Sequence, residues 1–172
     1  MRDLRLSALP TFQTSPILLP VTSFSFDPAD AAAALIVVEG EGAPERFLLQ
    51  HRDRIAGILY PGFWGCFGGA RDAGETPEQA LRRELREELG LDFGIADYFT
   101  AVNYDFRFCG KGVTLREYYV VRIAASVLYT LRLGEGQAMA TFDPTEVFAL
   151  RDIIPFDLWA IWLYVHREAL TK

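Results

Sequence analysis

The sequence GARDAGETPEQALRRELREELGL, residues 69–91, leads from a glycine into a helix with an unusual charge pattern. Glu84, Glu87 and Glu88 follow the spacing i, i+3 and i+4, so their carboxylates project from one face of that helix. Like charges at these spacings repel one another and destabilise an isolated helix. Such a face is either fully solvated or held by a positive charge, and clustered carboxylates are the hard oxygen ligands that Mg²⁺ and Mn²⁺ prefer.

Local signals define both ends of this helix. Thr76 is a favourable N-cap, Pro77 suits the first helical position, and Gln79 completes a capping box with Thr76. Gly90 is expected to end the helix in the left-handed conformation. An apolar stripe at helical spacing predicts that one side packs on the core, and its members are Leu81, Leu85 and Leu89. The acidic face therefore lies at the rim of the core, which favours a site over a solvated surface.

In this stretch the chain resembles the Nudix hydrolase family, and in particular its MutT-like members. The spacing matches the Nudix box without a departure: Gly69, five residues, Glu75, seven residues, Arg83-Glu84-Leu85, one residue, Glu87-Glu88, one residue, Gly90-Leu91. The resemblance implies an α/β/α sandwich around a mixed β-sheet. It also implies hydrolysis of a pyrophosphate bond in a nucleoside diphosphate linked to another moiety, with Mg²⁺ or Mn²⁺ as cofactor.

The resemblance assigns metal-binding roles to four positions. Glu87 and Glu88 match the principal metal-binding acids of the family. Glu84 matches an acid that serves as a metal ligand, as the general base, or as both. The backbone carbonyl just before the box commonly binds a metal in this family, which here indicates Gly68.

Further acids and one arginine are candidates for catalytic roles. Arg83 is expected to orient the acids, with Glu75 as its partner across the loop, although Arg83 could also simply offset the charge of Glu87. A structural role is favoured for Arg83 and Glu75. The family often places another glutamate on a downstream loop, for which Glu135 is the first candidate and Glu146 the second. Each of the two could instead be a solvated acid in a loop or at a helix start, and for Glu146 that explanation is favoured.

Residues outside the box are candidates for substrate binding. Arg52 resembles the position at which MutT-like members offer a cation to a phosphate, and an exposed arginine is the equal alternative. Phe63, Trp64, Tyr104 and Phe106 are candidates to stack on a nucleobase. Aromatic residues in strands more often belong to the core, so that alternative stays open for all four.

Three other residues with reactive side chains carry no recognisable pattern. His51 and His166 are predicted to lie at the surface, and Cys66 is predicted to be a small buried residue rather than a nucleophile.

Composition limits the class of protein. The 172 residues are sufficient for one domain with a sizeable core, and 51% of them are hydrophobic. The net charge of −6 and the lack of a basic run make a nucleic-acid duplex an unexpected partner. No signal peptide and no apolar run long enough for a membrane span is recognisable, so a cytoplasmic protein without membrane contact is expected.

Turn residues and apolar runs divide the chain into expected elements. Prolines at positions 10, 16, 20 and 28 predict an extended N-terminal arm over residues 1–30, followed by the Nudix domain over residues 31–172. A hairpin is expected from residues 31–38 and 46–50, and a second from residues 93–108 and 114–123. The remaining expectations are a strand over 64–67, a Gly68-Gly69 turn, a strand over 126–133, a short helix near 143–144 and a helix over 156–169.

Substrate choice is only partly constrained. A nucleoside triphosphate or a nucleotide sugar is ranked first, because Phe106 stands where the ADP-ribose hydrolases of the family tend to have proline. A catalytically silent Nudix domain, acting as a ligand-sensing or interaction module, is the alternative function. Such domains usually lose box acids, and this chain keeps all of them. The oligomeric state stays open, with a homodimer as one candidate.

Overall fold

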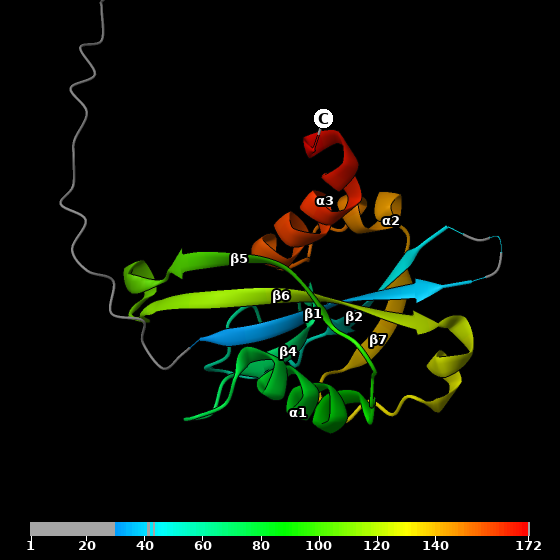
Figure 1. Ribbon diagram of the computed structural model, residues 1–172. Coiled ribbons are helices and arrows are strands. Elements are labelled where there is room, and N and C mark those ends of the chain that lie inside the picture. The colour runs from blue at the N-terminus through cyan, green and yellow to red at the C-terminus, as the bar shows by residue number, and fades with distance from the viewer. Residues whose placement is uncertain (1–29, 41, 43, 172) are drawn as a thin grey trace, which may run out of the picture.

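A seven-stranded mixed sheet forms the centre of the protein in a computed structural model that describes residues 30–40, 42 and 44–171 (Figure 1). The strands run in the order β3-β2-β1-β6-β5, while β4 pairs with β1 and β7 pairs with β2. Their bounds are β1 (Ala31–Glu39), β2 (Arg46–His51), β3 (Trp64–Gly65), β4 (Phe67–Ala70), β5 (Asp97–Asp105), β6 (Val113–Ala124) and β7 (Ala138–Phe142). The pair β1–β6 is parallel and the other pairs are antiparallel, which includes both predicted hairpins, β1–β2 and β5–β6.

Helices cover both faces of the sheet. Helix α1 (Pro77–Leu89) lies on one face, and α2 (Pro144–Ala149) and α3 (Pro155–Leu170) lie on the other (Figure 1). Strand β1 therefore sends alternate side chains into two separate cores, which is why its sequence is apolar without interruption. This arrangement confirms the predicted α/β/α sandwich. None of the described helices is long and apolar enough to cross a membrane.

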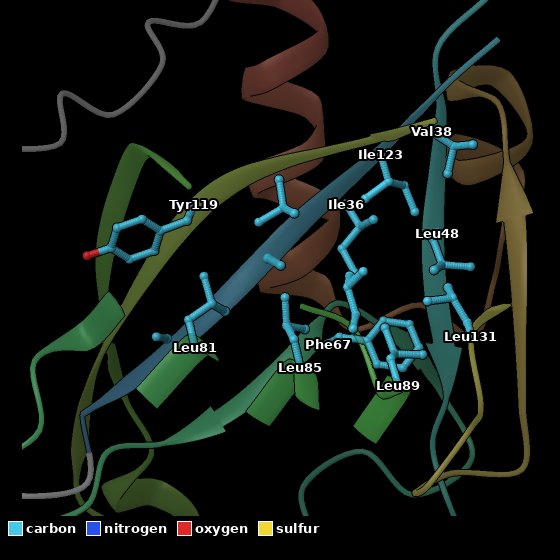
Figure 2. Close-up of a cluster of buried hydrophobic side chains, with 14 residues drawn as sticks. Ile36, Val38, Leu48, Phe67, Leu81, Leu85, Leu89, Tyr119, Ile123 and Leu131 are labelled. Carbon is cyan, nitrogen blue, oxygen red and sulfur yellow. The ribbon is translucent and has the colours of Figure 1, made fainter. Parts of the chain in front are cut away.

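The predicted boundaries of α1 are confirmed. The Thr76 side chain accepts a hydrogen bond from the Gln79 backbone, the Gln79 side chain returns one from the Thr76 backbone N–H, and Gly90 has a left-handed φ of 63°. The predicted leucine stripe, Leu81, Leu85 and Leu89, is fully buried and points toward the sheet (Figure 2). Packing of this stripe holds the neighbouring acidic face of α1 beside β4.

The expected strand over 64–67 and the Gly68-Gly69 turn were wrong in detail. Two short strands, β3 and β4, replace them, and both glycines lie inside β4. Gly68 has a φ of 122°, and a Cβ there would lie 2.2 Å from the Ala32 carbonyl oxygen. The glycines therefore allow the β4 backbone to pass close to β1, rather than to turn.

The first strand of the second hairpin begins later and ends earlier than expected. Strand β5 starts at Asp97, so residues 93–96 are not extended strand, and it ends at Asp105. Phe106 and Phe108 therefore lie beyond the strand that was expected to include them, and Phe108 is part of a 3₁₀ turn over Arg107–Cys109. Phe106 is buried and Phe108 is exposed.

The expected strand over 126–133 is wrong. Residues Ala125–Thr130 form a 3₁₀ helix, because Val127, Leu128 and Leu131 recur at a helical spacing that packs them on the core below β6. Strand β7, which pairs with β2, was missed because its sequence, AMATF, has little intrinsic β preference. Both C-terminal helices were predicted correctly. The predicted N-terminal arm falls on residues outside the described part, apart from Asp30.

Candidate active site

The candidate site lies where the acidic side of α1 meets β4. Gly69 faces α1, and a Cβ at this position would lie 2.5 Å from the Glu84 carboxylate. The Gly68 N–H donates a hydrogen bond of 2.8 Å to Oε2 of Glu88. The glycine pair thus lets two carboxylates of the helix approach the backbone of a strand, which brings Gly68, Glu84 and Glu88 together as the sequence predicted.

Arg83 joins the start of the loop to the acids. Its guanidinium donates two hydrogen bonds of 3.0 Å to the two carboxylate oxygens of Glu75, and a third, of 2.7 Å, to Glu84. The Arg83 guanidinium also donates a longer hydrogen bond of 3.4 Å to Glu87 and another to the Ala70 carbonyl. The hydrogen bonds from Arg83 are the largest cause of the lowered pKa of Glu75. Arg83 and Glu75 are therefore hydrogen-bonded to each other beside Glu84, and their orienting role stays a prediction.

Glu88 has a buried carboxylate with few hydrogen-bond donors around it. Its side chain is 4% exposed, and besides the Gly68 N–H it accepts only a 3.3 Å bond from Nε2 of Gln50 among the contacts found in the described residues. Burial, with a smaller contribution from the nearby charges of Glu84 and Glu135, raises the pKa of Glu88 to about 7, and the hydrogen bonds from Gly68 and Gln50 oppose that rise. Glu88 is thus held in a place that favours a neutral acid or a nearby cation.

Glu84 and Glu87 differ in their surroundings. Burial raises the pKa of Glu84, while the hydrogen bond and charge of Arg83 oppose that rise and the charges of Glu87 and Glu135 add to it. The Glu87 side chain is 62% exposed and faces solvent at the edge of the same cluster. The three acids predicted to bind metal therefore form a gradient from buried Glu88 to exposed Glu87.

Glu135 belongs to a loop that rests on the end of α1. The Gly134 N–H donates a 2.7 Å bond to the Glu88 carbonyl, and the Glu135 carbonyl accepts a 3.1 Å bond from Gln50. The Glu135 side chain is exposed, and its charge reaches both Glu84 and Glu88. Glu135 therefore lies beside the box acids, where a downstream ligand or base was predicted.

Gln50 was missed in the sequence. It is only 1% exposed, and its amide bridges the Glu88 carboxylate and the Glu135 backbone. The signal was one polar residue at the end of the apolar strand sequence RFLLQH. A buried amide of this kind usually has a specific partner, but one sequence does not tell which one.

The donors at this site suit a divalent cation such as Mg²⁺. Glu84, Glu87 and Glu88 supply carboxylate oxygens, and the raised pKa values of Glu84 and Glu88 indicate that added positive charge would be favourable. Among the described residues, no three acidic, histidine or cysteine side chains already converge around one point. Arg83 and the Gly68 N–H occupy carboxylate oxygens of Glu84 and Glu88 instead.

Of the predicted substrate-binding residues, Arg52 and Phe63 lie at the two ends of the loop between β2 and β3, and Trp64 begins β3. Arg52 is half-buried, and its backbone is fixed by bonds to Phe63 and Gln137. Phe63 is half-buried with its ring 5.5 Å from that of Tyr60. Trp64 stacks on His51 with ring centroids 4.8 Å apart and makes an edge contact with Phe142. Trp64 is therefore already packed against aromatic neighbours, and its predicted role stays a prediction, as do those of Arg52 and Phe63.

An apolar pocket of about 420 Å³ opens between β5 and the start of α3. Tyr104 and Phe106, the other predicted base-stacking residues, both line it, together with Phe156 and Trp159. The rings of Tyr104 and Phe156 lie 4.7 Å apart. Two aromatic residues that were interpreted as either core or base platform thus form the wall of a pocket.

Residues that were given a simple structural interpretation mostly fit it. Glu146 completes a capping box with Asp143 and pairs with Arg46 at 2.7 Å, so it lies in the start of α2. Cys66 is buried, as predicted, and burial raises the pKa of its thiol. The two histidines are half-buried instead of lying free at the surface, because His51 stacks on Trp64 and His166 stacks on Trp162.

The comparison with protein families matches residues 28–164 to the NUDIX domain. The chain belongs to the Nudix family. A match of this length covers the whole sheet and most of α3, so membership extends well beyond the box in which the resemblance was found.

Individual relatives resemble shorter parts of the chain. A nucleoside triphosphatase NudI of Enterobacter sp. is 59% identical over 54 residues, which are 31% of this chain and 36% of that protein. An 8-oxo-dGTP diphosphatase of Proteus vulgaris is 49% identical over 45 residues, 26% of this chain and 40% of that protein. An octanoyltransferase of Myxococcus xanthus is 40% identical over 70 residues, 41% of this chain. The matched part spans only 18 to 40% of the length of these three relatives.

The fold is shared with solved Nudix structures. The MutT protein of Methanosarcina mazei superimposes with a TM-score of 0.66 and 18% identity, over 87% of this chain and 100% of that chain. A MutT Nudix hydrolase of Burkholderia pseudomallei gives a TM-score of 0.62 and 22% identity, over 79% of this chain and 97% of that chain. At these identities the likeness shows the fold alone.

Proposed function

We propose that this chain is a metal-dependent pyrophosphohydrolase that cleaves a nucleoside diphosphate linked to another moiety. The observation that carries the proposal is that the carboxylates of Glu84 and Glu88 both lie against the Gly68–Gly69 backbone. Of these two acids, only Glu84 is hydrogen-bonded to Arg83 among the described residues, and the pKa of Glu88 is raised to about 7, so negative charge at this place lacks a full partner. Family membership and the names of the relatives support the same class of reaction. The chain also keeps every acid of the box, which silent Nudix domains usually lose.

The box residues would divide the work according to their positions. Glu84, Glu87, Glu88 and the Gly68 carbonyl would hold Mg²⁺ or Mn²⁺. When bound, the cation would neutralise the diphosphate and lower the pKa of an attacking water. Arg83, held by both oxygens of Glu75, would keep the Glu84 carboxylate aimed at the site. Glu84 or exposed Glu135 would accept the proton of the water, since both lie in the same cluster.

A nucleoside triphosphate or a nucleotide sugar is the proposed substrate class. The relatives named above include a nucleoside triphosphatase and an 8-oxo-dGTP diphosphatase, which supports a nucleotide. The aromatic pocket lined by Tyr104 and Phe106 opens beside α3, whereas the acids lie on α1 on the other face of the sheet, so the pocket does not support the choice of a base.

A phosphate-release screen with Mg²⁺ and Mn²⁺ tests this proposal. The panel contains nucleoside triphosphates, nucleotide sugars, dinucleoside polyphosphates and coenzyme A. We expect metal-dependent release from a nucleoside triphosphate or a nucleotide sugar, and a loss of about 10³-fold in Glu88→Gln, comparable to removal of another directly acting catalytic group.

Glu78→Gln is the matched control for that screen. Glu78 is an exposed acid in the first turn of the same helix and pairs only with Arg82 among the contacts found in the described residues. Its substitution is expected to leave the rate within about twofold, as for a surface change. Silence across the panel with folded protein and bound metal would contradict the enzymatic proposal and favour the sensing or interaction module.

A further inference from the structure

Asp157 is a carboxylate on the opposite face of the sheet from the acid site, and it is fully buried. It lies in the first turn of α3, in the core that this helix shares with β1 and β6. A buried carboxylate is unfavourable unless charged or hydrogen-bonding partners surround it. Its partners therefore indicate what the residue does.

The partners of Asp157 come from two elements. Oδ2 accepts a 2.8 Å hydrogen bond from the backbone N–H of Cys66, the residue between β3 and β4. Oδ1 accepts a 2.9 Å bond from the hydroxyl of Tyr118, and Nε of Arg116 lies 3.3 Å away. Tyr118 and Arg116 both belong to β6. One oxygen is thus committed to the β3–β4 junction, and the other is held by β6.

The β3–β4 junction is closely fitted to α3. A Cβ at Gly65 would lie 2.8 Å from Oδ2 of Asp157 and 2.5 Å from Ile154, so a larger residue there would push the helix away. The Trp64 N–H donates to the Asp152 carbonyl at 2.7 Å, and the Ile154 N–H donates to the Trp64 carbonyl at 2.8 Å. Three consecutive residues of the junction, 64–66, are therefore held by the start of α3.

The same segment leads directly into the acid site. Gly68 follows Cys66 by two residues, and its N–H holds the Glu88 carboxylate at 2.8 Å. The Cys66 bond to Asp157 is therefore the last side-chain hydrogen bond, among those found in the described residues, before the Gly68 backbone. A shift of the junction would move the N–H and the carbonyl of Gly68 relative to Glu88.

We propose that Asp157 is a positioning residue, which sets the place of the Gly68 backbone in the acid site through its bond to Cys66. This inference rests on the proposed function in one respect: Gly68 and Glu88 belong to the metal site. The competing explanation is that Asp157 only anchors α3 to the sheet. Under that explanation the acid site would be unchanged whenever the protein is folded.

The test compares two substitutions of Asp157 with two readouts that need no turnover. Mn²⁺ affinity is measured by electron paramagnetic resonance, and exchange of the Cys66 and Gly68 amides is measured by NMR. Asp157→Ala removes the acceptor, so we expect the Mn²⁺ Kd to rise by about tenfold or more, as for other residues that act behind metal ligands. The Cys66 and Gly68 amides are expected to exchange about tenfold faster than in the unchanged protein, while the β1–β6 amides keep their relative protection.

Asp157→Asn is the conservative variant. Its side-chain oxygen can still accept the Cys66 N–H, so Mn²⁺ affinity and Gly68 exchange should return to within about threefold of the unchanged protein, even though the charge opposite Arg116 is lost. Ile161→Val is the stability control, because Ile161 is buried on α3 and has no part in the site. It should lower the melting temperature without a selective change at Gly68.

The outcomes separate the two explanations. An unchanged Mn²⁺ Kd and unchanged Gly68 exchange in folded Asp157→Ala would overturn the positioning role. If that variant does not fold, Asp157→Ser carries the same test, since its side chain is shorter than that of aspartate and cannot keep the Cys66 bond. Failure of the unchanged protein to hydrolyse any nucleotide would overturn the proposed function, while the Mn²⁺ and exchange results would still decide the role of Asp157.

Discussion

Two buried carboxylates on opposite faces of the sheet have opposite surroundings. Asp157 has the Arg116 guanidinium at 3.3 Å, the Tyr118 hydroxyl and the Cys66 N–H, so its charge is compensated within the protein. Glu88 has one backbone N–H and a long bond from Gln50, and the negative charges of Glu84 and Glu135 lie nearby. The contrast is what we expect if Asp157 is a positioning residue and Glu88 has the proposed role of a metal ligand.

Removing the guanidinium of Arg116 beside Asp157 should have the largest effect on stability. Arg116→Met leaves a buried carboxylate without its charged partner, and we expect a loss of about 3–5 kcal/mol in the free energy of unfolding. Chemical denaturation at pH 7 measures it. The double variant Arg116→Met with Asp157→Asn should recover part of that loss because no unpaired charge remains. A loss below about 1 kcal/mol in the single variant would mean that Asp157 does not need Arg116.

Replacing Glu88 by a neutral residue should raise the stability of the metal-free protein, whereas loss of Arg116 should lower it. Because burial raises its pKa in the folded state to about 7, ionisation of Glu88 destabilises the metal-free protein as the pH rises from about 4.5 to above 7. Glu88→Gln should therefore stabilise the metal-free protein by up to about 3 kcal/mol at pH 8 and have little effect near pH 4. Thermal unfolding across this pH range measures the difference. A Glu88→Gln protein that is less stable than the unchanged protein at pH 8 would contradict the prediction.

Arg83 sharpens the contrast because its hydrogen bonds go to Glu75, Glu84 and Glu87, with none to Glu88 among the contacts found in the described residues. Arg83→Lys keeps the charge but loses the paired bonds to Glu75, so we expect about a tenfold fall in kcat with only a small change in stability. Arg86→Lys is the matched control on the same helix, because Arg86 is 61% exposed and pairs with Asp92. Equal rates in both variants would exclude an orienting role for Arg83.

The sequence predicted the parts of the site that depend on local order. The spacing of Glu84, Glu87 and Glu88, the capping box and Gly90 are all set within one helix, where neighbours in sequence are neighbours in space. Gln50 and Asp157 were not found, because their partners lie 38 and 91 residues away in the chain. Nothing in a single sequence indicates which distant backbone group a buried polar side chain will meet.

The fold was predictable to a similar degree and for the same reason. The hairpins β1–β2 and β5–β6 join adjacent segments with clear apolar runs and turns, and both were predicted. Strand β7 has a weak sequence signal, and it is stabilised by pairing with β2, which is distant in sequence. The apolar run 126–133 suited either a strand or a helical turn, and packing below β6 decided for the turn.

The most direct measurement is the melting temperature of the protein during a titration with Mn²⁺ at pH 7.5, compared with that of Glu88→Gln. A ligand that binds only the folded state raises its stability with concentration. We predict a rise in the unchanged protein and little or none in Glu88→Gln, because Glu88 holds the charge that the cation offsets. Equal rises in both proteins, or none in either, would contradict a metal site built around Glu88.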